Sequence, residues 1–192
     1  METAKVQHLR VALISDTHGH WDDALARAVD GADELWHAGD LGPMTDHLEA
    51  WEAAKPGRKV RAITGNIDGY PLTRSYPAEL DFTTAGVRVW MIHIGGYPGR
   101  FSPGVRAAWP NKLAYGPVNL FVCGHSHILR VARDPFSQAL CLNPGAAGIH
   151  GFHHIRTLLR FELSDGTVKN MEAVELGLRG KTALDPTLAD PY

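Results

Sequence analysis

The chain has 192 residues, of which 44% are hydrophobic and 21% are charged. A chain of this length is typical of one domain that buries a core without a disulfide or a metal to hold it together. Its 19 basic and 21 acidic residues give a net charge of −2, which disfavours a broad surface for nucleic acid or anionic membrane. No apolar run approaches the roughly 20 residues that span a bilayer.

The N-terminal region has no basic segment followed by an apolar one, so we expect no secretory signal and a cytoplasmic protein. Both cysteines, Cys123 and Cys141, lie inside apolar runs. We therefore expect them to be reduced core residues rather than a disulfide or a thiol nucleophile.

Short apolar runs rich in β-branched residues predict strands in the first 125 residues. These runs are Leu9–Ile14, Glu34–Ala38, Lys59–Thr64, Val87–Ile92 and Asn119–Cys123. Segments with helical periodicity lie between several of them. Alternating strands and helices predict an α/β fold with a largely parallel sheet.

Three segments have apolar residues at helical spacing. The first stripe comprises Trp21, Ala24, Leu25, Ala28 and Val29, and the second comprises Met44, Leu48 and Trp51. In the third segment, Ser102 is the predicted N-cap and Pro103 the first helical residue. The side chains expected to face inward there are Val105, Ala108, Trp109 and Leu113.

The second half of the chain predicts antiparallel strands instead. Ile128–Arg133 and Ala139–Leu142 flank a turn-forming segment and predict a hairpin. Apolar residues alternate from Leu159 to Leu163, and the turn Asp165-Gly166 leads into Val168–Val174. We therefore expect two sheets covered by helices.

The chain has no repeat, low-complexity segment or linker that would divide it. We expect one domain over residues 1–192. The last part, from about residue 176 to 192, has two prolines and little periodicity, so we expect a terminal tail or a surface strap there.

Potential metal ligands follow each strand predicted in the first part of the chain, usually beside a glycine. They are Asp16, His18, Asp40, Asn66, His93, His125 and His127. Because ligands bind at the carboxyl ends of strands in open α/β sheets, we expect these side chains to converge. Imidazole, carboxylate and amide oxygen together suit Mn, Fe, Zn, Ni or Co. The number of donors exceeds one tetrahedral site and suits two ions that share a carboxylate.

Each of these motifs has an ordinary interpretation when taken alone. Asp-x-His is often a surface pair, and Gly-Asp and Gly-Asn are common turn sequences. A histidine in an apolar run, such as His93, is commonly a hydrogen-bonded core residue. It is the occurrence of donors at successive strand ends that favours a metal site.

In this order the motifs resemble the signature of the calcineurin-like metallophosphoesterase superfamily: Asp-x-His, Gly-Asp, Gly-Asn, a histidine before glycine, and Gly-His-x-His. The small size and the segment Asn143–Ala146 look most like its small phosphodiesterase branch. The resemblance implies a four-layer α/β sandwich, in which helices flank two mixed β-sheets, and a dinuclear metal centre. By analogy, one ion is held by Asp16, His18 and His127, the other by Asn66, His93 and His125, and Asp40 bridges both.

Two positions depart from the family pattern. Position 67 is isoleucine, where many relatives have a histidine that contacts the phosphate and protonates the leaving group; the small branch commonly lacks it. The fourth motif reads His93-Ile94-Gly95, with one residue inserted before the glycine. The candidates for an alternative acid are His20, His150, His153 and His154.

Three residues have expected roles beside the metal ligands. Asp68 is expected to support a metal ligand without binding the ion itself. Arg100 is a candidate for binding a phosphate oxygen, with a solvated loop charge as the alternative. His20, just after the first motif, is a second candidate for contact with the substrate.

The expected activity is the hydrolysis of small-molecule phosphodiesters, with Asp40, Asn66 and His93 as catalytic residues. Two divalent ions, manganese being favoured over iron, nickel, zinc and cobalt, would activate a bridging water as hydroxide. Without a histidine at position 67, aryl esters should react faster than alkyl esters.

Two alternatives remain open. The same fold serves as a protein-interaction scaffold in relatives that have typically lost metal ligands. A polynucleotide nuclease is disfavoured, because the basic cluster Arg58-Lys59-Arg61 is too small to reverse the net charge. Aromatic residues near Tyr97 and Phe101 could line a substrate pocket or a contact in a homo-oligomer.

Overall fold

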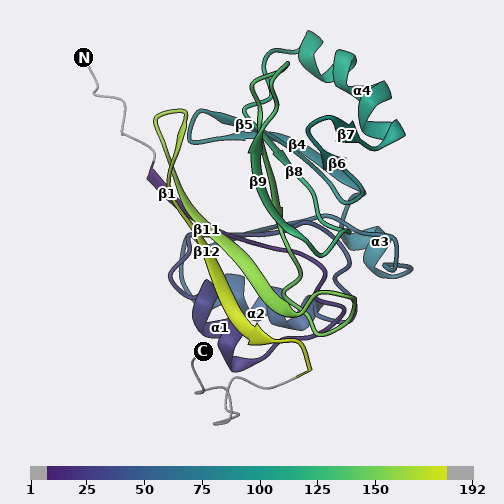
Figure 1. The fold of residues 1–192 in the computed structure, drawn as a ribbon. Helices are drawn as coiled ribbons and strands as arrows, with labels where there is room; N and C mark the ends of the chain where they lie inside the picture. The colour runs from purple at the N-terminus through teal and green to yellow at the C-terminus, as the bar shows by residue number, and fades with distance from the viewer. Residues whose placement is uncertain (1–7, 181–192) are drawn as a thin grey trace, which may run out of the picture.

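The computed structural model describes residues 8–180, and its two large sheets pack face to face with helices on both outer sides (Figure 1). The helices are α1 (Asp23–Val29), α2 (Thr45–Ala53), α3 (Leu72–Ser75) and α4 (Pro103–Ala114). In this part of the chain, every helix is too short or too polar to cross a lipid bilayer.

The first sheet has five strands in the order β12-β11-β1-β2-β3. The strands are β1 (His8–Ile14), β2 (Glu34–His37), β3 (Lys59–Ala62), β11 (Ile155–Ser164) and β12 (Thr167–Leu178). β1, β2 and β3 are parallel, whereas β11 and β12 pair antiparallel. Helices α1 and α2 cover the outer face and bury Leu25, Val29 and Leu48 against it.

The second sheet has the order β4-β5-β8-β10-β9. Its strands are β4 (Glu79–Thr84), β5 (Val87–Ile92), β8 (Leu120–Val122), β9 (Leu129–Arg133) and β10 (Leu140–Pro144). β5, β8 and β10 are parallel, with antiparallel strands at both edges. Helix α4 covers the outer face over Trp90 and Phe121, and a short hairpin, β6 (Gly96–Tyr97) and β7 (Arg100–Phe101), precedes it.

The main core lies between the two sheets. It includes Leu13 and Trp36 from the first sheet and Val89 and Val122 from the second, all of them buried. Trp36 makes an edge-to-face contact with Phe161, with ring centroids 5.6 Å apart. Each fully buried large apolar side chain stabilises the fold by roughly 1.5–3 kcal/mol. The expected four-layer α/β sandwich of two mixed sheets is confirmed.

The predicted cap of the third helix is confirmed, but one of its inward residues is not. The Val105 N–H donates to the Ser102 hydroxyl, and Pro103 is the first residue of α4. Leu113, however, is 39% exposed. It follows Val105 by more than two turns and lies about 80° round the helix from it, beyond the edge of the buried face.

Two further corrections concern strands. Residues 176–178, expected in a terminal tail, belong to β12, because Leu178 pairs with Ile155 and Leu176 is buried. Residues 181–192 lie outside the described residues. Strand β4 was not predicted; it pairs with β5 through a tight turn at Ala85-Gly86, where both residues have positive φ.

Candidate metal centre

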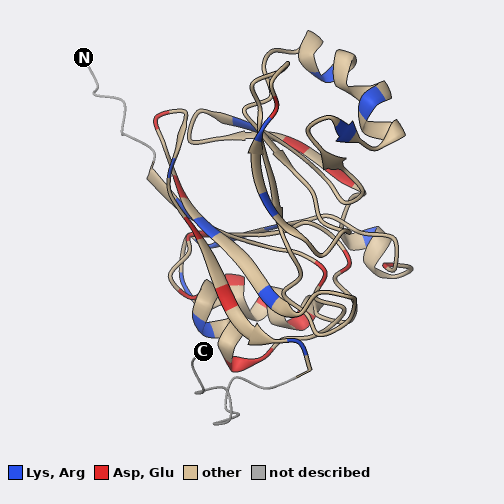
Figure 2. Cartoon of the chain, viewed as in Figure 1, with Lys and Arg blue, Asp and Glu red and all other residues tan. Residues whose placement is uncertain are grey.

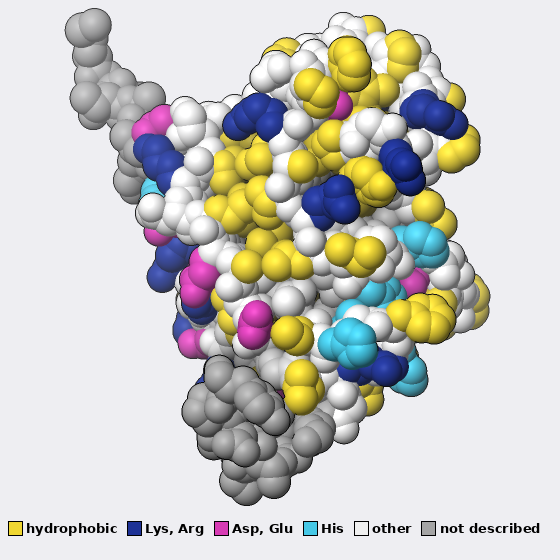
Figure 3. Space-filling model, in the orientation of Figure 1, with side chains coloured by type: hydrophobic (Ala, Val, Ile, Leu, Met, Phe, Trp, Pro, Cys, Tyr) yellow, Lys and Arg dark blue, Asp and Glu magenta, His cyan; other side chains and the backbone are white. Residues whose placement is uncertain are grey.

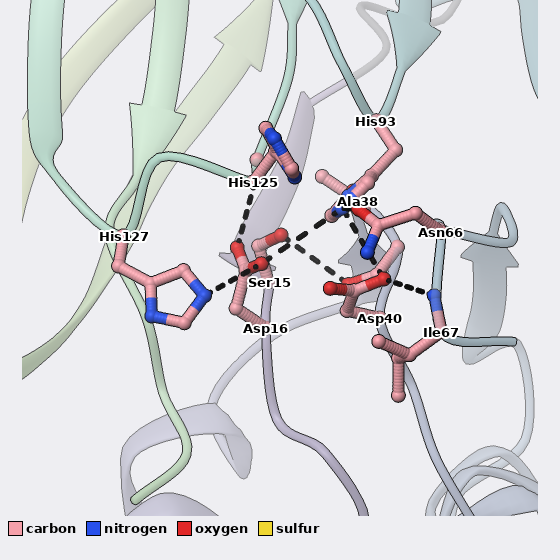
Figure 4. Close-up of polar contacts among 12 residues, drawn as sticks. Ser15, Asp16, Ala38, Asp40, Asn66, Ile67, His93, His125 and His127 are labelled. Atoms are coloured by element: carbon pink, nitrogen blue, oxygen red, sulfur yellow. Dashed lines mark hydrogen bonds and ion pairs between the residues drawn. The ribbon is translucent and has the colours of Figure 1, made fainter. Parts of the chain in front are cut away.

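The carboxyl ends of β1, β2 and β3 in the first sheet meet those of β5 and β8 in the second. Figure 4 shows Asp16, Asp40, Asn66 and His93 directed toward a common point, with His127 facing Asp16. Residues far apart in the chain are thus neighbours here, as the strand-end pattern predicted. The first sheet supplies Asp16, His18, Asp40 and Asn66, and the second supplies His93, His125 and His127.

One group of potential ligands consists of Asp16, His18 and His127. Their ligand atoms all lie within 4.8 Å of one another. In this group, Asp16 Oδ1 lies 3.2 Å from His127 Nε2. Nearby, His18 Nε2 lies 3.6 Å from Asp40 Oδ2, so Asp40 borders this group.

A second group consists of Asp16, Asp40 and His93, all buried. His93 Nε2 lies 3.2 Å from Asp40 Oδ1 and 3.9 Å from Asp16 Oδ1. The side-chain oxygen of Asn66 is also 3.2 Å from His93 Nε2. Asp40 therefore faces His93 with one oxygen and His18 with the other, which suits a carboxylate between two ions.

His125 lies at the rim rather than inside either group. Its side chain is exposed, and its ring lies beside that of His93 with centroids 5.3 Å apart. Its backbone N–H donates to Asp16 Oδ2 at 3.1 Å. The structure thus places the backbone of His125 against the centre, and its role as a metal ligand stays a prediction.

The backbone at this centre adopts a conformation that L-residues rarely take. Of the nine non-glycine residues with positive φ in the described chain, five are potential ligands. They are Asp16, His18, Asp40, His125 and His127, with φ between 49° and 68°. Such residues cost on the order of 1–2 kcal/mol each and cluster at functional sites. Here hydrogen bonds between the loops hold them in place, including Asp16 N–H to Gly39 O at 3.0 Å.

Asp68 joins two of the ligand-bearing loops. Its buried carboxylate accepts hydrogen bonds from the N–H groups of Leu41 (3.0 Å), Gly42 (2.9 Å) and Gly65 (2.8 Å). The loop that carries Asp40 is thereby tied to the loop that carries Asn66. This geometry suits the supporting role expected for Asp68.

The hydrogen bonds of His93 define its free nitrogen. The Ala38 carbonyl lies 2.7 Å from Nδ1 and can only accept, so Nδ1 carries the proton. The other nitrogen, Nε2, then faces the oxygens of Asp16, Asp40 and Asn66. Burial lowers the pKa of His93, but hydrogen bonds to Asp40 and Ala38 outweigh burial and raise it overall. A positive charge at this nitrogen, from a proton or a metal ion, is therefore favoured.

A hydrogen-bonded chain likewise orients His127. His153 Nε2 lies 3.0 Å from the Gly148 carbonyl, and His153 Nδ1 lies 3.2 Å from His127 Nδ1. The carbonyl accepts from Nε2–H, which leaves Nδ1 of a neutral His153 to accept from His127 Nδ1–H. His127 Nε2 then carries a lone pair that is directed at Asp16. Burial lowers the pKa of His153, which favours the neutral ring.

The residues present fit divalent cations. Asp16 Oδ1 and His18 Nε2 are buried and have no hydrogen-bond partner, an arrangement that is costly unless a cation binds between them. Burial lowers the pKa of His18 and favours its neutral, metal-binding form. Burial raises the pKa of Asp40, but hydrogen bonds from His93 and the Ile67 N–H outweigh burial and keep it below its ordinary value. Carboxylates beside neutral imidazoles are ligands that borderline metals prefer.

The four candidate acids occupy different positions. His20 belongs to neither group of potential ligands, and its Nε2 lies 3.3 Å from Asp22. The segment after β10 folds over the centre, since the Gly148 N–H donates to Asp16 O. This places the His150 ring 5.5 Å from that of His18, centroid to centroid, and His153 beside His127. His154 is exposed, and no contact with the potential ligands is found for its side chain within residues 8–180.

Two supporting residues were not found by sequence reasoning. His37, fully buried at the end of β2, contacts the Thr17 hydroxyl through Nε2 (2.8 Å) and accepts from Gly39 N–H through Nδ1 (3.2 Å). Asn143 donates to the Gly124 carbonyl at 2.7 Å and holds the loop of the last motif. His37 lies inside an apolar strand, and no local pattern distinguishes it from a core residue. Asn143 was noted only as part of a family-like segment.

Comparison with known proteins agrees with this geometry. The family model of the calcineurin-like phosphoesterase superfamily domain matches residues 9–166. A comparison with curated proteins found no significant match.

Solved structures share the fold at low sequence identity. A protein from Streptococcus pneumoniae TIGR4, described as a predicted phosphoesterase, is 20% identical, with a TM-score of 0.58 over 92% of this chain and 95% of the other. A protein described as a novel archaeal phosphodiesterase is 16% identical, with a TM-score of 0.62 over 86% and 99%. Vps29 from Entamoeba histolytica, in complex with Zn²⁺, is 18% identical, with a TM-score of 0.56 over 88% and 99%. From the family match over most of its length, this chain belongs to the calcineurin-like phosphoesterase superfamily.

Proposed function

We propose that this protein is a metal-dependent phosphodiesterase that acts on small molecules. One observation carries the proposal: the Nε2 atoms of His18, His93 and His127 lie 3.2–3.9 Å from carboxylate oxygens of Asp16 and Asp40. Among these atoms, Asp16 Oδ1 and His18 Nε2 are buried without a hydrogen-bond partner. The family match and the likeness in fold to an archaeal phosphodiesterase support it. Small substrates are favoured because Arg58 and Arg61 are already paired with Asp30 and Glu34.

We infer two ion positions from the arrangement of donors. Asp16, His18 and His127 would hold one ion, Asn66, His93 and His125 the other, and Asp40 would contact both. When bound, two such ions supply positive charge to the phosphoryl oxygens and acidify a water molecule. Manganese is our first choice, and the Zn²⁺ complex of the Entamoeba protein supports a divalent ion on this fold.

The protein's own residues would position the substrate. Asn66 is exposed at the rim, so its amide can reach a phosphoryl oxygen while its neighbour Ile67 holds Asp40 through a backbone N–H at 3.1 Å. Asp68 holds the loop of Asp40 and the loop of Asn66 together through its hydrogen bonds to both. Because these groups are fixed before the substrate arrives, little reorganisation accompanies the reaction.

The residue at position 67 predicts a preference among leaving groups. Ile67 is 46% exposed and borders a cavity of about 680 Å³, but it cannot donate a proton to a departing alkoxide. A general acid typically contributes roughly 100-fold or more, so alcohols that are poor leaving groups should suffer most. With Mn²⁺, methyl p-nitrophenyl phosphate should be hydrolysed at least about 100-fold faster than dimethyl phosphate. If the two diesters were hydrolysed at comparable rates, a residue other than that at position 67 would be acting as the general acid.

The proposal is tested by comparing metal-dependent diesterase activity of the wild type, Asp40→Asn and the exposed control Glu49→Gln. Asp40→Asn should reduce turnover of bis(p-nitrophenyl) phosphate by roughly 100-fold or more, while the control retains it. A protein-interaction scaffold would show no metal-dependent turnover in any of the three proteins, and that result would overturn the proposal.

A further inference from the structure

A basic cavity adjoins the candidate metal centre on the side of the second sheet. It has a volume of about 260 Å³ and lies between the β6–β7 hairpin, β9 and the loop after β8. Figure 2 marks basic residues on β7 and β9, and Figure 3 shows basic side chains on this face next to a group of histidines. The lining includes Gly95, Tyr97, Arg100, His125, Ser126 and Arg130.

The two guanidinium groups of this cavity have no acidic partner. Within residues 8–180, the side chains of Arg100 and Arg130 form no ion pair and donate no hydrogen bond, and no aspartate or glutamate lines the cavity. By contrast, Arg88 on β5 of the same sheet pairs with Asp81 at 2.9 Å. Two unpaired guanidinium groups that face one small cavity favour a bound anion.

The cavity is also partly fixed in shape. The Arg130 guanidinium lies over the Tyr97 ring, 4.0 Å from its centroid, so stacking holds its plane while the N–H edges remain free. Ser126 Oγ accepts hydrogen bonds from Asn143 Nδ2 (3.1 Å) and Ile128 N–H (3.3 Å). Its own O–H finds no acceptor among the described residues. The hydroxyl can therefore donate into the cavity alongside the arginines.

We propose that Arg100, Ser126 and Arg130 form a subsite for a second anionic group of the substrate, a phosphate or a carboxylate. This inference rests on the proposed phosphodiesterase function, because His125 lines the cavity while its backbone N–H contacts Asp16 of the metal centre. The scissile phosphate would lie at the metal centre, and the subsite would bind an anion carried by one of the two alcohol groups. The substrate class is thereby narrowed to phosphodiesters that bear an additional negative charge.

The kinetic test compares two diesters that release the same product. These are p-nitrophenyl phenyl phosphate and its analogue with a carboxylate on the phenyl ring. For the wild type, the analogue should have the lower KM. In Arg130→Met and Arg100→Met, the ratio of the two KM values should fall about tenfold, as expected for the loss of a charge-assisted hydrogen bond. Arg130→Lys should retain part of the difference in KM. The control is Arg106→Met, an exposed α4 residue outside the cavity that removes the same charge.

A binding experiment separates failure of the subsite from failure of the enzyme. Inorganic phosphate is titrated at constant ionic strength into protein treated with EDTA. Its affinity should fall about tenfold in Arg130→Met and stay unchanged in Arg106→Met. If neither diester is hydrolysed, the proposed function fails, and phosphate binding still tests the subsite. If both arginine variants bind phosphate and discriminate between the diesters like the wild type, the subsite proposal is overturned.

Discussion

The contact between His127 and His153 makes a prediction about a single side chain. His153 accepts from His127 Nδ1–H and leaves the opposite nitrogen free for a metal ion. His153→Leu should therefore weaken metal binding by roughly 10–100-fold, as loss of such supporting hydrogen bonds does elsewhere. His153→Asn should restore much of the affinity, because an amide oxygen can accept the same bond. The measurement is a Co²⁺ titration followed by visible absorption.

The control for this prediction is His154→Leu, which removes an exposed neighbouring imidazole. If His153→Leu and His154→Leu bind Co²⁺ equally well, His153 does not orient His127. The Co²⁺ spectrum reports ligand geometry directly, so a general loss of stability would not imitate the expected change.

His37 makes a prediction about pH. Burial lowers the pKa of His37 to about 4, from an ordinary value of 6.5. Because the folded state binds this proton less readily than the unfolded state, its contribution to stability is present above pH 6.5 and is lost as pH falls toward 4. The loss amounts to about 3 kcal/mol. His37→Gln should flatten this part of the pH dependence, measured by urea unfolding in EDTA, whereas His154→Gln should leave it unchanged. If the free energy of unfolding of His37→Gln fell with pH as steeply as that of the wild type, the assignment of this pH dependence to His37 would be contradicted.

The seven potential ligands could be predicted because each is a donor residue at a strand end, where the fold class places binding sites. The supporting roles of His37, Asn143 and His153 could not be predicted from the sequence. His37 contacts Thr17 of the first ligand loop, and Asn143 contacts the loop after β8. The contacts of His153 depend on how the segment after β10 packs on the loop of Asp16. A local sequence pattern does not encode such packing between distant segments. His20, close in sequence to the first motif, belongs to neither group of potential ligands, and its contact with the substrate stays a prediction.

At the level of elements, Arg156 connects β11 to α1. Its side chain is fully buried, donates to the Ala147 carbonyl at 2.8 Å and pairs with Asp22, the N-cap of α1. Burial raises the pKa of Asp22, but hydrogen bonds from Arg156 and the Leu25 N–H outweigh burial and lower it to about 2. One carboxylate thus caps a helix and neutralises a buried guanidinium.

Removal of the two partners of this pair should have unequal costs. Asp22→Ala leaves a buried charge unpaired and should lower the free energy of unfolding by about 3–5 kcal/mol. Arg156→Met leaves Asp22 partly open to water and should cost about 1–3 kcal/mol. Arg160→Met, on the same strand but in an exposed pair with Glu172, should cost at most about 1 kcal/mol. Urea unfolding at neutral pH would measure all three, and equal losses for Asp22→Ala and Arg160→Met would contradict the argument.

The elements predicted from the sequence were those with a repeating apolar pattern. The predicted runs at Glu34–Ala38 and Lys59–Thr64 extend beyond the observed strands, because their last residues leave the ladder to form the ligand loops. The Ala38 carbonyl, for instance, binds His93 instead of continuing the sheet. Strand β4 has alternating burial but a mixed composition, and only its pairing with β5 identifies it.

Across the whole molecule, the candidate metal centre lies between the two sheets. Asp16 and Asp40 belong to loops of the first sheet, while His93 and His127 follow strands of the second. Besides the apolar core, hydrogen bonds join these loops: His93 bonds to the Ala38 carbonyl, and the His125 N–H donates to Asp16. A metal ion bound by both would add a bond between the sheets where the core ends.

This arrangement predicts that metal binding stabilises both sheets together. At a metal concentration about 100 times Kd, the gain is about 2.7 kcal/mol, which corresponds to a rise in Tm of roughly 5–10 °C for a chain of this size. Mn²⁺ added to EDTA-treated protein should give this shift in the wild type and in the exposed-carboxylate control Glu49→Gln, but not in Asp40→Asn. Hydrogen exchange should slow at the loops after β2 and β8 alike, since the ion contacts both. Protection confined to the loops of one sheet would show that the metal is held on that side only, and the centre would then not join the two halves of the fold.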